Sequence, residues 1–198
     1  MDIGYPTVQL ELPQTWVRVP IAADGDRAGQ RALLADWCGG EAPPADLLRR
    51  LVRESRRSAS EGIAFAAVLL ATVDGHGTGV QRVAVGGSLT IGFRRAPGTP
   101  RVVAEGVLEA LRRGTVPTRR AELVGLAADA DRPAVLVQEQ GWSEDQLLAR
   151  TEVLWPVEGQ LAGLCVTTAD LPLAAAMRDV ALSVAASLSV ERVAPVNA

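Results

Sequence analysis

The sequence predicts an α+β domain in which a central antiparallel sheet of about six or seven strands is flanked by helices, as in an α/β/α sandwich. Three observations predict this class. Apolar runs typical of strands recur along the chain. Four segments have the apolar spacing of amphipathic helices. Short turns rich in Gly and Asp join successive strands, which favours antiparallel pairing.

The first half of the chain supplies short edge strands, two helices and a buried strand. Alternating apolar residues predict two short strands within 7–19, or one strand bent at Pro13. Apolar spacing predicts helices over 27–37 and 45–60, the first stopped by the glycines after Cys38. The apolar run 63–73 predicts a buried strand. After the turn DGHGTG, strands are expected over 80–85 and 88–93, separated by Gly86-Gly87.

The second half is expected to alternate one helix with two strand pairs. The helix 101–113 has three inward-facing residues, Val103, Val107 and Leu111. Four strands follow, over 116–127, 134–140, 146–157 and 159–168, with the turn 129–131 between the first two.

The chain is expected to close with a helix over 171–191 that lies across the last strand pair. Asp170 stands at its N-cap position. Its apolar stripe consists of Leu173, Met177, Val180, Val184 and Leu188. The opposite face is mostly Ala and Ser, small enough for a second surface to approach closely. We therefore expect one domain over 1–198, with an ordered core at about 7–191 and short flexible termini.

Composition excludes several classes of protein. Of 198 residues, 48% are hydrophobic, so the chain is long and apolar enough to bury a core. All 20 basic residues are Arg and the net charge is −3; this bias is typical of a high-GC bacterium such as an actinobacterium. An acidic total without Lys disfavours nucleic-acid binding. The chain shows no signal peptide and no apolar run long enough to span a bilayer, so we expect a cytoplasmic protein without membrane insertion.

No motif predicts catalysis, a cofactor or a metal site. His76, the single histidine, lies in a glycine-rich turn with no nucleophile elbow elsewhere in the chain. The glycines of that turn stand between strands, where a dinucleotide fingerprint requires a strand and a helix. Cys38 and Cys165 are far apart and lack metal-ligand spacing. We therefore expect neither an enzyme nor a bound cofactor.

Charge and tryptophan placement give candidate partner-binding residues. The segment 94–120 holds seven Arg against two Glu, which can steer an acidic partner, although most such segments are solvated helix faces. Three tryptophans, Trp16, Trp37 and Trp155, are expected in the core, whereas Trp142 follows a glycine in a loop and is equally suited to contact a partner. The candidate set is Arg94, Arg95, Arg119, Arg120 and Trp142.

The order of elements and the stretch LPQTWVRV near the N-terminus resemble Mog1/PsbP-like domains. The resemblance covers roughly 8–190 and rests on element order and on that one motif. It implies an α/β/α sandwich around an antiparallel sheet and a binding or assembly role without a shared catalytic set.

Three classes of function stay open at this point. The first is a non-enzymatic interaction module that binds a protein partner, with a homodimer formed through a sheet edge or the Ala-rich helix as one form. The second is a small-ligand-binding protein or enzyme with a polar pocket lined by Asp74, His76 or a cysteine. The third is a structural subunit of a larger secretion or phage-like assembly. The missing catalytic cluster favours the first.

Overall fold

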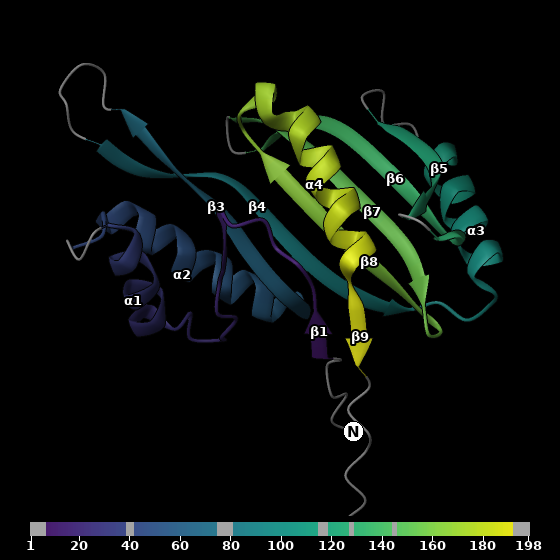
Figure 1. Ribbon diagram of the computed structural model, residues 1–198, viewed down its shortest axis with the longest axis horizontal. Coiled ribbons are helices and arrows are strands. Elements are labelled where there is room, and N and C mark those ends of the chain that lie inside the picture. Colours follow the sequence, from purple (N-terminus) through teal and green to yellow (C-terminus); the bar gives the residue numbers. More distant parts are fainter. Residues whose placement is uncertain are drawn as a thin grey trace, which may run out of the picture. The chain divides into compact units, whose positions relative to one another are not determined.

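The computed structural model describes residues 7–38, 42–74, 81–114, 119–126, 129–143 and 146–191. Its elements are β1 (Thr7–Gln9), β2 (Trp16–Arg18), α1 (Arg27–Trp37), α2 (Ala45–Ser60), β3 (Ile63–Asp74), β4 (Gln81–Arg95), α3 (Pro100–Arg113), β5 (Arg120–Leu126), β6 (Asp129–Ser143), β7 (Gln146–Val157), β8 (Gln160–Thr168), the 3-10 turn η1 (Leu171–Leu173), α4 (Ala174–Ser187) and β9 (Ser189–Glu191) (Figure 1). Among the described helices, none has the length and apolarity to cross a membrane.

The main sheet has seven antiparallel strands in the order β2-β3-β4-β8-β7-β6-β5, which confirms the predicted α+β class. Strands β5 to β8 pair with their sequence neighbours, as their short turns indicate. Strand β4 borders β8 instead of β5, because α3 intervenes and carries the chain to the far edge.

The chain divides into two compact units within β4: Pro13–Thr90 is one, and Met1–Leu12 with Ile91–Ala198 is the other. The expectation of a single domain over 1–198 stays a prediction.

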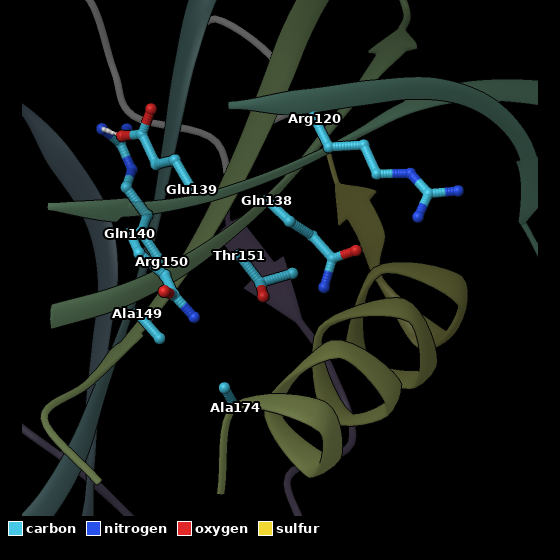
Figure 2. A pocket seen from close by; sticks show the side chains of 8 residues that line it. All are labelled: Arg120, Gln138, Glu139, Gln140, Ala149, Arg150, Thr151 and Ala174. Carbon is cyan, nitrogen blue, oxygen red and sulfur yellow. Dashed lines mark hydrogen bonds and ion pairs between the residues drawn. The ribbon is translucent and has the colours of Figure 1, made fainter. Parts of the chain in front are cut away.

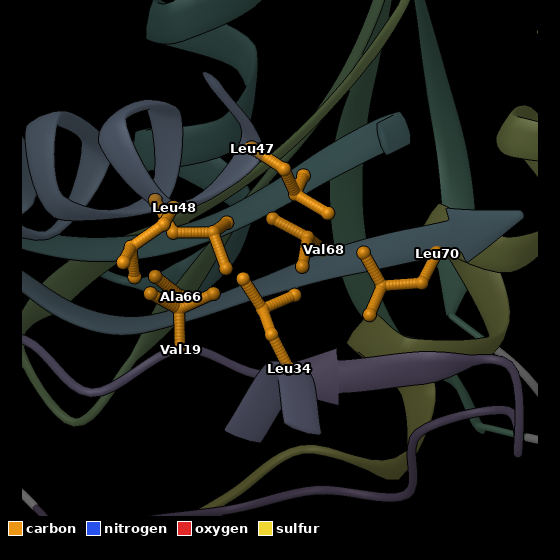
Figure 3. Close-up of a cluster of buried hydrophobic side chains, with 8 residues drawn as sticks. Val19, Leu34, Leu47, Leu48, Ala66, Val68 and Leu70 are labelled. Atoms are coloured by element: carbon orange, nitrogen blue, oxygen red, sulfur yellow. The ribbon is translucent and has the colours of Figure 1, made fainter. Parts of the chain in front are cut away.

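The unit Pro13–Thr90 packs α1 and α2 on one face of β3. Alternate residues of β3, Ala66, Val68 and Leu70, meet Leu residues of both helices in one buried cluster (Figure 3). Apolar spacing predicted the buried Leu47, Leu48 and Leu51 of α2, whereas the same buried face also includes Ser55 and Ser58, which that spacing did not indicate.

The other unit has helices on both faces of its strands. On one face, Ala104 and Leu108 of α3 pack on Val135, Val137 and neighbouring apolar residues of β6 to β8. The remaining face is covered by α4, which crosses β7 and β8 in Figure 1. We call these the α3 face and the α4 face. Each strand residue belongs to one of them, because side chains alternate along a strand.

Several element boundaries differ from the prediction. Gly86 and Gly87 do not end a strand, because β4 continues through them to Arg95. The turn expected over 129–131 is wrong as well, since β6 starts at Asp129 and pairs there with Leu126 of β5. The last helix stops at Ser187, and Ser189–Glu191 instead forms β9, which pairs with β1 in a separate two-stranded sheet.

The buried faces of two helices are centred on smaller residues than expected. In α3, Ala104 and Leu108 are buried, whereas Val103 and its predicted companions are only partly covered. In α4, the predicted Met177 and Val184 are buried, but Ala181 and Ala185 are also fully buried. The small side chains therefore let α4 approach its own sheet closely.

Tryptophan burial agrees with the prediction at two positions of three. Trp16 is 6% exposed and Trp155 is 1% exposed. Trp37, the last residue of α1, is 37% exposed and is not among the buried residues of that helix, so its assignment to the core was wrong. Trp142 lies within β6 and not in a loop, and 76% of its surface is exposed.

Candidate functional site

Strand register brings a row of polar residues together on the α4 face. Arg120 of β5 pairs with Gln138 of β6, which pairs in turn with Thr151 of β7. Two residues further along β6, on the same face, Gln140 pairs with Ala149. Two residues beyond that, Trp142 pairs with Leu147. Three cross-strand rows therefore lie side by side on this face. The first begins at Arg120 of the edge strand β5, and the third holds the exposed indole of Trp142.

The first two rows line a concave site of about 200 Å³, which we call the polar hollow. Figure 2 shows it between the strands and the first residue of α4, Ala174. No side chain caps this end of α4. The full lining is Arg120, Gln138, Glu139, Gln140, Ala149, Arg150, Thr151 and Ala174.

Two side chains of the polar hollow, Thr151 and Gln138, make no hydrogen bond within the described residues. Thr151 is only 5% exposed, yet its hydroxyl makes no hydrogen bond with any residue of the described part of the chain. The amide of Gln138, which is half-buried, is likewise unbonded within the described ranges. Within the described residues, the fully enclosed polar side-chain atoms without a partner are Gln30 Oε1 and Trp155 Nε1. The Thr151 hydroxyl and the Gln138 amide are not among them, so both are open to solvent and available to a molecule that is bound from outside.

Arg120 is the cation of the polar hollow that is least engaged by the protein. Its side chain is 78% exposed, and its Nη2 lies 3.7 Å from Glu122 Oε2, beyond hydrogen-bonding distance. Glu122 also lies 3.7 Å from Arg178 of α4, which is itself 3.6 Å from Asp179. These long, exposed pairs hold Arg120 weakly.

On the α3 face, by contrast, the charges are closely paired. Glu139 accepts from Arg119 Nε at 2.9 Å and from Arg150 Nη1 at 3.2 Å. Arg150 also donates to Glu152 at 2.9 Å and to the Cys165 sulfur at 3.2 Å. Glu139 and Arg150 approach each other in Figure 2, and their side chains lie on the face opposite to the polar hollow, so these two lining residues lend it no free charge.

Cys165 is not an activated nucleophile. Burial raises the pKa of its thiol, and the neighbouring Arg150 only partly opposes that rise. A thiol with a raised pKa carries little thiolate at neutral pH, and the thiolate is the reactive form. Its contact with Arg150 is therefore structural.

The five predicted partner-binding residues fall in three places. Arg120 and Trp142 share the α4 face with the polar hollow. Arg119 lies on the α3 face, where its side chain is 25% exposed and bonded to Glu139. Arg94 and Arg95 are exposed at the end of β4, next to Ala96, whose N–H donates to the Gly159 carbonyl in the turn after β7. That turn and Trp142 lie at opposite ends of β7.

Sequence reasoning missed Gln138, Gln140 and Thr151. A signal was present, since the apolar run of β6 changes at Gln138 to the polar run QEQ, followed by an exposed indole. A strand that becomes polar on both faces has left the core. Thr151 gives no such signal, because its burial depends on the strands and helix beside it.

Within the described residues, no three His, Cys, Asp or Glu side chains form a group that could hold a metal ion. His76 and the glycines of its turn lie outside the described residues. The lining of the polar hollow includes neither Asp74 nor a cysteine, so this site is not the pocket that the sequence led us to consider for a ligand-binding protein or enzyme.

No family model matches the chain, and no curated protein matches its sequence. Solved structures do resemble it. A protein of Bacteroides thetaiotaomicron has a TM-score of 0.52 at 11% identity, covering 94% of this chain and 46% of its own. LpqN of Mycobacterium tuberculosis, involved in cell envelope biogenesis, has a TM-score of 0.47 at 13% identity, covering 96% and 87%. Cyanobacterial PsbP of Synechocystis has a TM-score of 0.39 at 13% identity, covering 96% of both chains.

These similarities concern the fold. The chain spans just under half the length of the Bacteroides protein. Membership of a Mog1/PsbP-like family stays a prediction, because no family model matches the chain. The fold and the site together define an α+β protein with a concave polar surface at one end of an antiparallel sheet.

Proposed function

We propose that this protein is a non-catalytic module that binds a protein partner through the α4 face, at the surface running from Arg120 across the polar hollow to Trp142. The observation that carries the proposal is the position of Trp142. Its indole is 76% exposed and shares its side of β6 with the polar hollow. Trp and Arg are the residues most enriched among those that dominate binding energy in protein interfaces.

Chemistry of the surface favours binding over catalysis. The polar hollow contributes amides, a hydroxyl and a guanidinium, which are suited to hold a polar group. Its one lining carboxylate, Glu139, accepts hydrogen bonds from two arginines on the α3 face and is therefore not placed to move a proton in the polar hollow. The predictions of a cytoplasmic location, a homodimer and membership of a larger assembly are separate from this proposal and stay predictions.

Affinity capture with matched variants tests the proposal. Trp142→Ala and Arg120→Glu should each abolish capture of the same partner that the unaltered protein retains. Val102→Ala and Arg101→Glu are matched controls on α3, where Val102 is 64% exposed and the Arg101 side chain is 81% exposed. A partner lost equally from all four variants, or retained by the first two, would show that binding occurs elsewhere.

A further inference from the structure

We infer that the polar hollow is a receptor for a carboxylate group carried by the protein partner; the inference rests on the proposed function and names the chemistry that its site takes. The first step is the excess of donors. The Thr151 hydroxyl and the Gln138 amide are free to donate, and Arg120 has a guanidinium engaged only at 3.7 Å. The acceptor that the described residues offer to Arg120 is the Glu122 carboxylate, which lies beyond hydrogen-bonding distance.

Geometry places these donors within reach of one small group. Arg120, Gln138 and Thr151 are cross-strand neighbours on three adjacent strands. Adjacent strands lie roughly 4.8 Å apart, so the outer two α-carbons are separated by roughly 10 Å, with the Gln138 amide between them. The volume of about 200 Å³ exceeds the ~30 Å³ of a single water molecule several times over, which leaves room for a carboxyl group and its aliphatic stem.

The charge of the polar hollow suits a monoanion. Of its charged lining residues, Arg150 and Glu139 neutralise each other at 3.2 Å, so Arg120 contributes the one cation that is not closely paired. The N-terminal end of α4 lies beside the polar hollow at Ala174 and adds the favourable end of a helix dipole, although the Ala174 N–H itself donates to the Leu171 carbonyl of η1. One guanidinium with neutral donors matches a planar, singly charged carboxylate, which Arg can bind through two parallel N–H groups.

The test is a titration of the intact protein with acetate, followed by amide NMR at constant ionic strength. Acetate should shift the backbone amide signals of Gln138, Thr151 and Ala175 in a saturable manner. Thr151→Val and Arg120→Gln should each weaken this binding about tenfold, because each removes a donor to a charged group. Arg101→Gln, on α3, is the matched control and should bind acetate as the unaltered protein does.

Two further arms identify the source of the carboxylate. A peptide with both ends blocked and an internal glutamate, and a peptide with only its C-terminal carboxylate free, should compete with acetate; the tighter competitor identifies the group that the partner inserts. Inorganic phosphate should bind more weakly than acetate, and tighter phosphate binding would overturn the inference.

The outcomes separate this inference from the proposed function. Absence of acetate shifts in the unaltered protein, or shifts that both variants retain at full affinity, would overturn the carboxylate receptor even where partner capture still depends on Trp142. The opposite result is also possible to read. If Thr151→Val and Arg120→Gln both lose acetate binding while Trp142→Ala and Arg120→Glu still capture the partner, the carboxylate receptor is supported and the proposed interface is refuted. The variants' amide spectra also report whether each remains folded.

Discussion

Replacing Thr151 with valine should leave the protein as stable as before or make it more stable. The two side chains have nearly the same shape, and Thr151 is 5% exposed with a hydroxyl unbonded within the described residues. The substitution therefore loses no hydrogen bond and buries one more methyl group. At about 0.8 kcal/mol per buried methylene-sized group, we expect the free energy of unfolding to change by between about 0 and +1 kcal/mol.

Thr168→Val is the matched control on the neighbouring strand. Thr168 is 2% exposed, but its hydroxyl oxygen accepts from the N–H of Asp170 at 3.0 Å, at the start of the turn that leads to α4. Removing that acceptor should lower the free energy of unfolding by about 1 kcal/mol or more, because the N–H loses its partner. The free energies of unfolding of the two variants should thus differ by about 1–2 kcal/mol, with Thr151→Val the more stable.

Urea denaturation and thermal unfolding of the three proteins measure the difference. For a chain of this length, a change of 1 kcal/mol shifts Tm by about 2–4 °C. Equal destabilisation by Thr151→Val and Thr168→Val would refute the reasoning, since it would mean that the Thr151 hydroxyl supports the fold. Unchanged stability combined with lost acetate binding would assign that hydroxyl to binding.

Three further predictions concern the rest of the unit. Glu139→Gln should lower the free energy of unfolding in urea by about 1–2 kcal/mol, since the Glu139 side chain is 19% exposed and hydrogen-bonded to two guanidinium groups. Its control is Glu105→Gln. Glu105 is 53% exposed in a surface ion pair, so this change should alter the same free energy by less than about 0.5 kcal/mol. Ala185→Leu should lower the free energy of unfolding by about 1–3 kcal/mol in thermal unfolding, because Ala185 is fully buried on the inner face of α4. The same change at the exposed Ala175 of α4 should be nearly neutral. The raised pKa of Cys165 means that the folded state keeps its thiol proton at a pH where the unfolded state loses it; the free energy of unfolding should therefore fall as pH rises above the ordinary thiol pKa, and Cys165→Ala should remove that part of the fall.

Local sequence rules located the helices and failed where pairing dominates. The helices at 27–37 and 45–60 have the predicted bounds, because apolar spacing and stop residues act within a few turns. Gly86-Gly87 shows the opposite case. A glycine pair weakens an isolated strand, but β4 is an interior strand between β3 and β8, and ladder hydrogen bonds outweigh that local preference.

The closing helix shows how packing selects a face that spacing alone leaves open. The stripe through Met177 and Val184 was visible in the sequence, and both residues are buried. The sequence did not predict the burial of Ala181 and Ala185, because a small side chain is compatible with an exposed position as well as with a close contact. Only the approach of α4 to its strands decides between the two.

By itself, the sequence determined the α+β class, the order of most elements and the exposed character of Arg120, since these follow from periodicity, turn chemistry and charge along the chain. Only the tertiary structure decided that Arg120, Gln138, Thr151 and Trp142 occupy one face. The physical reason is register: a shift of one residue between two strands moves every side chain to the other face of the sheet. The candidate site exists because the pairing of β5, β6 and β7 aligns three polar side chains beside the N-terminal end of α4.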